Sequence, residues 1–204
     1  MFDLTKFKNN TEFYVVCVVM ALLFLSELVI WIYTAMGNSG NEKKRSDAGT
    51  VWLIILGWWC GIGASVFFRS RGIPEMIRGW LLPHFFCYIG IALILCGTLV
   101  RCDAVWTLKR AFTLTVQTTG KQHLIQTGLY HIVRNPAYLG SIMSLLGVAF
   151  VYRHMLGTLC VLLLCLVCYG VRIHVEERAL KEQFKEEFEQ YCRETKYKVI
   201  PGLY

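Results

Sequence analysis

The sequence predicts an all-α fold, a polytopic membrane bundle of about five transmembrane helices with an amphipathic helix at its C-terminal end. Of the 204 residues, 55% are hydrophobic and 17% are charged. An ordinary soluble domain has about 25% charged residues. The mean hydropathy is +0.47, and long uncharged runs recur along the chain. These observations exclude a soluble globular enzyme and a disordered chain, and they predict one membrane domain over residues 1–204.

Five apolar runs mark the expected spans. They cover residues 13–36, 51–68, 81–100, 137–152 and 155–171. A helix needs about 20 apolar residues to cross a hydrocarbon core of about 30 Å, so the shorter runs lie near the lower limit. Only Arg153 and His154 separate the last two runs, which predicts a helical hairpin.

The distribution of basic residues predicts the orientation in the membrane. Five spans place 6 of the 21 lysine and arginine residues on the N-terminal side and 15 on the C-terminal side. Because basic loops stay in the cytoplasm, we expect the C-terminus to be cytoplasmic and the N-terminus to lie on the opposite side. The basic loops would also contact anionic membrane lipids.

Two features inside the spans concern helix packing. A carboxyl group in mid-span is costly, so Glu27 either faces a partner or a cavity, or is protonated and hydrogen-bonded inside the bundle. Gly57, Gly61 and Ser65 recur every four residues in the second span. Such a stripe of small residues is typical of a face on which helices pack closely.

The sequence shows no pattern for metal or nucleic-acid binding. Cys165 and Cys168 form a CxxC pair, but they lie in mid-span with no second pair and no neighbouring histidine. Buried cysteine behaves as a small hydrophobic residue, so we expect no metal site. No Ser-His-Asp, HExxH or phosphate-loop motif is present.

A polar stretch before the fourth span carries the first informative motif. Residues 128–140 read Gly-Leu-Tyr-His-Ile-Val-Arg-Asn-Pro-Ala-Tyr-Leu-Gly. Pro136 moves the preceding residue out of the helical region and suits the first turn of a helix, so Asn135 is the expected N-cap. Backbone N–H groups at such a helix start can hold an anionic or polar ligand group. Tyr138 and Gly140 then lie within the first turns of this helix, where glycine allows close approach.

A second motif follows the fifth span. Arg172 and Glu176 are four residues apart, on one face of a helix. By spacing alone this is an ordinary helix-surface ion pair, although an arginine fork also suits a carboxylate ligand and a glutamate suits an ammonium or hydroxyl groups. We expect the tail to continue as an amphipathic helix that lies on the membrane or on the protein. Its apolar stripe is made of Leu180, Phe184, Phe188 and Tyr191.

Three blocks together resemble the isoprenylcysteine carboxyl methyltransferase family of integral membrane methyltransferases. They are residues 128–140, Arg172 with Glu176-Glu177, and residues 184–191 followed by Ile-Pro-Gly. Their order and spacing match the family pattern over roughly the C-terminal half of the chain. Two positions depart from it. Asn135 stands where the family usually has histidine, so it cannot carry a charge, and Lys185 stands where glycine is usual.

The resemblance implies that the cofactor is S-adenosyl-L-methionine. It divides the domain into an N-terminal three-span anchor, residues 1–112, and a cofactor-binding catalytic half, residues 113–204. Arg172 and Glu176 are the implied catalytic residues, and Arg172 would bind the methyl acceptor. The implied cofactor-binding residues are Gln117, Gln122, His123, Leu124, Ile125, Tyr130, Asn135, Pro136, Tyr138 and Glu176.

The expected activity is methyl transfer to a lipophilic acceptor that enters from the bilayer, most simply carboxyl O-methylation of an isoprenylcysteine-type substrate. An ionised carboxylate needs no general base, which agrees with the lack of an obvious base in these blocks. Three alternatives stay open. They are a phospholipid amine or small thiol as acceptor, a membrane reductase that uses a nicotinamide cofactor, and a membrane interaction protein without enzymatic activity.

Overall fold

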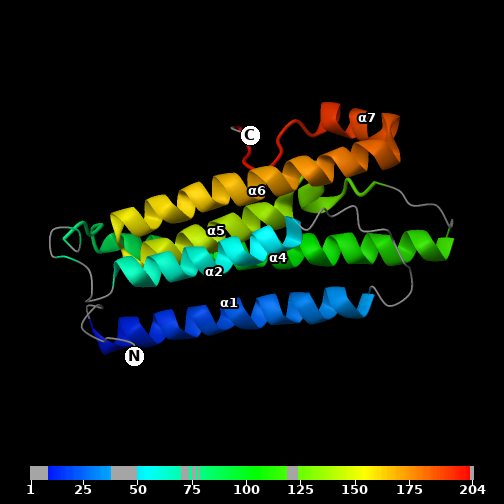
Figure 1. The fold of residues 1–204 in the computed structure, drawn as a ribbon. Helices are drawn as coiled ribbons and strands as arrows, with labels where there is room; N and C mark the ends of the chain where they lie inside the picture. Colours follow the sequence, from blue (N-terminus) through cyan, green and yellow to red (C-terminus); the bar gives the residue numbers. More distant parts are fainter. Residues whose placement is uncertain are drawn as a thin grey trace.

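The computed structural model describes residues 9–37, 50–69, 74, 77, 79–118 and 124–202. This part of the chain is all-α (Figure 1). Its elements are α1 (Asn10–Gly37), α2 (Thr50–Phe68), α4 (Phe85–Thr118), the 3₁₀ turn η2 (Gly128–His131), α5 (Pro136–Tyr152), α6 (Met155–Phe184) and α7 (Glu186–Glu194).

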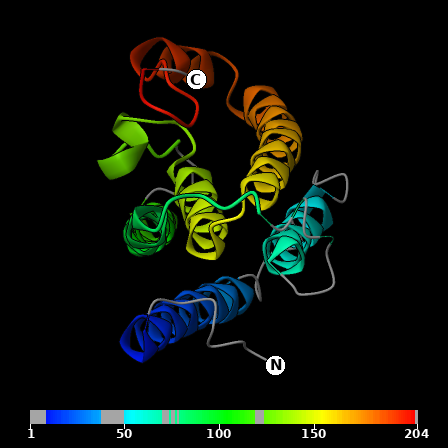
Figure 2. The same ribbon diagram turned by 90° about the vertical axis from the view of Figure 1, so that its left-hand side faces the viewer.

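Helix α5 is the centre of the bundle (Figure 2). It lies between α4 and α6, while α2 packs against α5 and α6, and α1 packs against α4. Half of α5 is buried although the chain is small, because helices contact it on three sides. The element that carries the Asn-Pro-Ala-Tyr motif is therefore held by most of the fold.

The five expected spans all fall on helices. Three helical stretches are long and apolar enough to cross a membrane, namely Asn10–Ile32, Phe85–Leu108 and Met155–Phe184. Two shorter apolar stretches, Trp52–Phe68 and Pro136–Tyr152, complete the set. The all-α class is thus confirmed, and a topology with five crossings stays a prediction.

Two helices differ in length from the apolar runs. The third expected span was residues 81–100, but α4 begins at Phe85 and continues to Thr118. Helix α6 continues past the fifth run to Phe184, as the helical spacing of Arg172 and Glu176 predicted. Charged residues end a run that suits a bilayer, yet lysine, arginine and glutamate are good helix formers, so they do not end the helix itself.

The predicted hairpin between the last two spans is confirmed. Helix α5 ends at Tyr152 and α6 begins at Met155, with Arg153 in the left-handed conformation between them (φ 55°). The chain just before α4 pairs with this turn, because the N–H of Leu82 donates to the carbonyl of Arg153 at 2.8 Å. This hydrogen bond ties the segment before α4 to the turn between α5 and α6.

Glycines set the contact between α4 and α5. A Cβ atom built on Gly140 would lie 2.5 Å from the carbonyl oxygen of Gly97, and one on Gly147 would lie 2.7 Å from that of Gly90. Real Cβ atoms do not approach this closely, so the two backbones touch at both levels. The close approach expected at Gly140 is confirmed, with α4 as its neighbour.

The small-residue stripe of α2 is also a packing face, as predicted. A Cβ on Gly57 would lie 2.8 Å from the Sγ of Cys168 on α6, and one on Gly61 would lie 3.2 Å from Leu145 on α5. Ser65 is buried. The stripe therefore faces the crevice between α5 and α6, where small side chains let three helices converge.

The tail does not form the one continuous amphipathic stripe that the sequence suggested. Lys185 has φ 44° and ψ −114° and separates α6 from α7. Helix α7 turns back onto the protein and buries Phe188 and Tyr191, which are 5% and 3% exposed. A residue in this backbone conformation breaks the helix whatever the side-chain pattern, since periodicity records only which residues become buried.

The conformation of Lys185 leads to a prediction about stability. Positive φ is strained for a residue with a Cβ and unstrained for glycine, which also explains the glycine usual at this position. Lys185→Gly is expected to raise the free energy of unfolding by about 1 kcal/mol. Lys185→Ala is the matched control, because it removes the charge and keeps the Cβ. Thermal unfolding in detergent measures the stability of both variants. An equal gain in stability for Lys185→Gly and Lys185→Ala would show that the strain does not come from the backbone.

Candidate functional site

The motif blocks of the sequence meet at one end of the bundle. The start of α5, the last turns of α6, η2, α7 and the C-terminal segment all gather there, on the right of Figure 1. A parallel bridge pairs Val133 with Tyr197, which ties the segment before α5 to the C-terminal segment. Residues separated by more than 60 positions are therefore neighbours.

Tyr138 joins the two predicted catalytic residues. Its hydroxyl donates to Oε2 of Glu176 at 2.5 Å and accepts a hydrogen bond from Nε of Arg172 at 3.0 Å. Arg172 and Glu176 also form the expected ion pair, with Nε and Oε2 3.8 Å apart. The arrangement is thus more than a pair on one helix surface, since a residue of α5 holds both side chains in place.

Asn135 occupies the N-cap position of α5, and Pro136 is in the first turn, as predicted. The Asn135 side chain makes no capping hydrogen bond, however. Its Nδ2 donates instead to the carbonyl of Lys198 at 3.1 Å, and its N–H donates to the same oxygen at 2.9 Å. This residue therefore anchors the C-terminal segment, a role that needs an amide N–H and no positive charge.

A cluster that sequence reasoning left without a role lies beside this contact. Nε of Arg134 donates to Oε1 of Glu177 at 2.9 Å, and its Nη1 donates to the carbonyl of Thr195 at 3.2 Å. Nζ of Lys198 lies 3.7 Å from Oε2 of Glu177. Arg134 and Glu177 stand in the motif blocks and could have been paired by their position there, whereas the involvement of Thr195 and Lys198 follows only from the fold.

Tyr130 is buried between α4 and α7. Its hydroxyl donates to the carbonyl of Ala104 at 3.4 Å, and its own carbonyl accepts a hydrogen bond from the hydroxyl of Tyr191 at 2.7 Å. Burial raises the pKa of the Tyr130 hydroxyl, and the Glu176 carboxylate raises it further. Tyr130 therefore stays protonated at neutral pH and lies within electrostatic reach of Glu176.

The remaining expected cofactor residues lie in and around the α4–η2 connection. Leu124 and Ile125 are partly buried, and the N–H of Leu124 donates to Oε1 of Glu187 on α7 at 3.1 Å. Gln117 belongs to the last turn of α4, but its side chain lies outside the described part. Gln122 and His123 are outside the described residues altogether.

The donor and acceptor groups of the site fit the implied cofactor. S-adenosylmethionine presents an ammonium group, a carboxylate, ribose hydroxyls and a sulfonium cation. The Glu176 side chain is 40% exposed, and its Oε2 contacts Tyr138 and Arg172, so the site offers a partly exposed carboxylate to a cation or a hydroxyl. Glu176 would hold the ammonium or the ribose. The first turn of α5 has few N–H groups left for the cofactor carboxylate, because Pro136 has none and those of Tyr138 and Leu139 donate to the carbonyl of Asn135.

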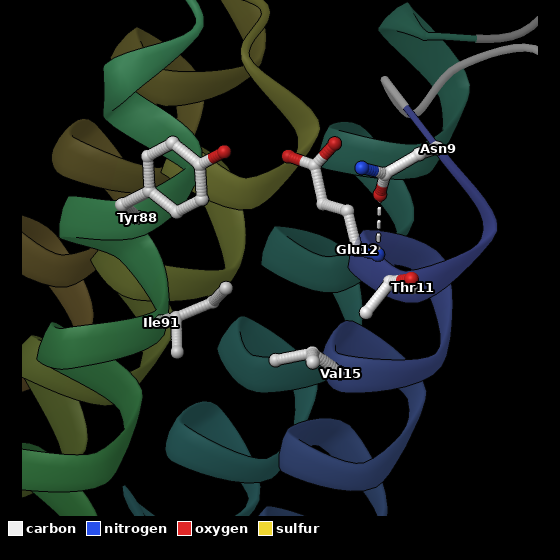
Figure 3. Close-up of a pocket in the computed structure, with 6 residues that line it drawn as sticks. All are labelled: Asn9, Thr11, Glu12, Val15, Tyr88 and Ile91. Carbon is white, nitrogen blue, oxygen red and sulfur yellow. Dashed lines mark hydrogen bonds between the residues drawn. The ribbon is translucent and has the colours of Figure 1, made fainter.

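A pocket of about 340 Å³ lies at the opposite end of the bundle, between α1 and α4. Figure 3 shows the Glu12 carboxylate directed from α1 towards α4, with the Tyr88 ring facing it. Oε1 of Glu12 lies 2.9 Å from Nε2 of His84, and the backbone N–H of Glu12 donates to Oδ1 of Asn9 at 2.8 Å. These contacts join the starts of α1 and α4, and none of the motif residues lines this pocket.

Comparison with known proteins assigns the motifs to a family. The model of the phospholipid methyltransferase family matches residues 85–187, from the start of α4 into α7. A protein of Oryza sativa subsp. indica named probable protein-S-isoprenylcysteine O-methyltransferase is 30% identical over 132 residues, 64% of this chain and 65% of the relative. Protein-S-isoprenylcysteine O-methyltransferase B of Arabidopsis thaliana is 25% identical over 134 residues, 65% of this chain and 64% of the relative.

A protein-S-isoprenylcysteine O-methyltransferase of Saccharomyces cerevisiae is 29% identical over 105 residues, 50% of this chain and 44% of the relative. The chain spans just under two thirds of the length of the rice and Arabidopsis relatives. The candidate spans and these similarities support an integral membrane protein. Because the matched region covers half of the chain and includes residues 128–140, Arg172 and Glu176, the chain belongs to the phospholipid methyltransferase family, which includes the isoprenylcysteine methyltransferases.

Proposed function

We propose that this protein methylates the carboxylate of a lipophilic, isoprenylcysteine-type acceptor with S-adenosylmethionine, at the boundary between membrane and cytosol. The observation that carries the proposal is the Arg172–Tyr138–Glu176 cluster at the end of the bundle. It places a cation that can orient a carboxylate beside a carboxylate that can hold a cationic cofactor. The names of the relatives point to the same acceptor chemistry.

Each residue of the cluster has a distinct role in this reaction. Bound S-adenosylmethionine supplies a methyl group already activated by its sulfonium. Glu176 fixes the cofactor through its ammonium or ribose, and Arg172 neutralises the acceptor carboxylate and directs one oxygen towards the methyl carbon. Tyr138 keeps both side chains in register, since its hydroxyl contacts both. The rate enhancement then comes from alignment and from the replacement of water around two charges.

No proton has to be removed in carboxyl methylation. A carboxylate is ionised at neutral pH, so the site needs no general base. The described residues of the cluster are an arginine, a glutamate and a tyrosine that bridges them, which agrees with this requirement. An amine or thiol acceptor would have to lose a proton first. The family description names phospholipids, so a phospholipid amine is the second candidate acceptor.

The site faces the cytosol in this proposal. Four basic residues lie inside candidate spans and are not counted with the loops, namely Arg101, Arg172, Arg178 and Lys181. Of the remaining 17 basic residues, 11 are on the C-terminal side of a five-span topology. The positive-inside rule then puts α7 and the C-terminal segment in the cytoplasm. The cofactor reaches the site from the cytosol, and the hydrocarbon tail of the acceptor reaches it from the bilayer.

The chemical stability of the product tests the proposal. Purified protein in lipid nanodiscs is incubated with S-adenosylmethionine labelled in the methyl group and with an S-farnesylated N-acetylcysteine. We expect a labelled product that releases methanol in mild base, because a methyl ester hydrolyses there and N-methyl and S-methyl products do not. The carboxamide of the same acceptor is the matched control, and it should not be labelled.

Two other outcomes would change the conclusion. Base-stable label in phosphatidylethanolamine, with a rate that rises through neutral pH, would identify amine methylation instead. Thermal stabilisation by a nicotinamide cofactor, with none by S-adenosylmethionine, would identify a membrane reductase and overturn the proposal.

A further inference from the structure

Glu27 has a charged partner, Arg101, in the neighbouring helix. Nε of Arg101 lies 2.6 Å from Oε1 of Glu27, and Nη2 donates to Oε2 at 3.0 Å. The two side chains are 21% and 25% exposed and come from two candidate membrane spans, α4 and α1. A two-pronged contact of this kind suits an ionised carboxylate. Of the two interpretations of Glu27, the structure therefore supports a charged partner.

The same guanidinium also binds α5. Nη1 of Arg101 donates to Oγ of Ser141 at 2.6 Å and to the carbonyl of Ala137 at 3.4 Å. Ala137 precedes Tyr138, and Ser141 lies one turn later with its side chain fully buried. Arg101 thus contacts the helical turn that carries Tyr138, while Glu27 neutralises its charge.

A second polar contact lies beside α5. The hydroxyl of Tyr169 on α6 accepts a hydrogen bond from Nε1 of Trp58 on α2 at 3.1 Å. The Tyr169 ring also lies 5.7 Å from the Tyr138 ring, so this contact borders the Arg172–Tyr138–Glu176 cluster.

Helix α4 holds the motif segment on both sides of the α5 start. Arg101 contacts the first turns of α5, and the carbonyl of Ala104, one turn further along α4, accepts the hydrogen bond of Tyr130. Buried charges in a membrane are expensive and are kept where they have a function. An ion pair that served only to join α1 and α4 would not need the third contact to Ser141.

We propose that Arg101 is a positioning residue of the methyl-transfer site. Its guanidinium, neutralised by Glu27, holds the first turns of α5 in register, and with them the Tyr138 hydroxyl that bridges Arg172 and Glu176. The role in methyl transfer rests on the function proposed above, whereas the role in ordering α5 does not.

Three variants separate positioning from simple helix pairing. E27Q keeps an oxygen that accepts from Arg101 and keeps the Arg101 donors to α5. E27M/R101M removes both charges together, which a protein interior usually tolerates because no unpaired charge is left behind. It also removes the Arg101 donors to Ser141 and Ala137. S141A removes the 2.6 Å contact, together with the hydrogen bond of the Ser141 hydroxyl to the Ala137 carbonyl within α5, and leaves the ion pair intact.

Two measurements are made on each full-length variant in nanodiscs, namely hydrogen exchange of the backbone amides of residues 137–144 and the dissociation constant of S-adenosylmethionine. Positioning predicts faster exchange and a dissociation constant raised about tenfold in E27M/R101M, and raised about threefold in S141A. E27Q keeps the Arg101 donors to α5, so its dissociation constant should rise less than that of E27M/R101M, even where its unfolding temperature falls. If the ion pair only joins the two helices, the variants would change the unfolding temperature. They would change neither the amide exchange of residues 137–144 nor the dissociation constant.

Wild-type exchange and wild-type affinity in both S141A and E27M/R101M would overturn the inference. If E27M/R101M does not fold, S141A alone decides, because its ion pair is unchanged. If the wild-type protein itself binds no S-adenosylmethionine, the proposed function fails. The exchange data then still decide whether Arg101 orders the start of α5, so the two failures are distinguishable.

Discussion

Glu176→Gln is expected to weaken the binding of S-adenosylmethionine by about 10- to 100-fold, because a hydrogen-bonded charge lost at a partly buried site costs about 1–3 kcal/mol. The carboxylate is held by Tyr138 through Oε2, and the amide keeps its size and shape. What the amide lacks is the negative charge that faces the cofactor ammonium. Calorimetric titration of the purified protein measures the effect directly.

The control for this variant lies on the same helix. Glu182→Gln removes an exposed carboxylate whose partner, Arg178, is exposed as well, and we expect no change in affinity. Arg172→Ala should differ from Glu176→Gln in kind, since it should raise KM for the acceptor more than the dissociation constant of the cofactor. Wild-type affinity in Glu176→Gln together with wild-type turnover in Arg172→Ala would contradict this assignment of the site.

Gly140→Ala is the second change with a large expected effect, and it acts through the packing of the helices. The new Cβ would meet the backbone of α4, at 2.5 Å from the carbonyl oxygen of Gly97 and 2.7 Å from the N of Arg101. Backbone atoms cannot rotate away, so α4 and α5 must separate. We expect a loss of about 1–3 kcal/mol in the free energy of unfolding, as for other overpacked cores.

Gly170→Ala is the matched control for this substitution. Gly170 lies in α6, and a Cβ built there meets no atom within 4 Å. Helix propensity then favours alanine by roughly 0.5–1 kcal/mol, so Gly170→Ala should be neutral or stabilising. Thermal unfolding in detergent compares the two variants. If the two variants are equally stable, the close contact at Gly140 makes no contribution to the free energy of unfolding.

Several parts of the fold could be predicted because they depend on neighbouring residues. Apolar runs located all five apolar helices, and the Arg153–His154 pair between two runs predicted the hairpin. Pro136 predicted where α5 begins, since proline restricts its own backbone and that of the preceding residue. The four-residue spacing of Arg172 and Glu176 predicted their ion pair.

Other parts could not be predicted, because they depend on which surfaces meet. Nothing near Tyr138 in sequence indicates that its hydroxyl bridges two residues more than 30 positions away. Arg101 looked like the residue that ends a span, and only the helix contacts show that it lies inside the bundle. The strained backbone at Lys185 was hidden behind a continuous apolar stripe.

The sequence by itself therefore determined the class of the protein, its helices and the residue types available for chemistry. These follow from hydrophobic length, helix propensity and the geometry of proline, all of which act over a few residues. The tertiary structure decided which of those residues act together. The glycine contacts at Gly97–Gly140 and Gly90–Gly147 bring α4 and α5 close enough for Arg101 to reach Ser141, and the C-terminal segment returns to hold Asn135. A hydrogen bond forms only within about 3.5 Å, so a site assembled from α4, α5, α6 and the C-terminal segment depends on packing that no local pattern specifies.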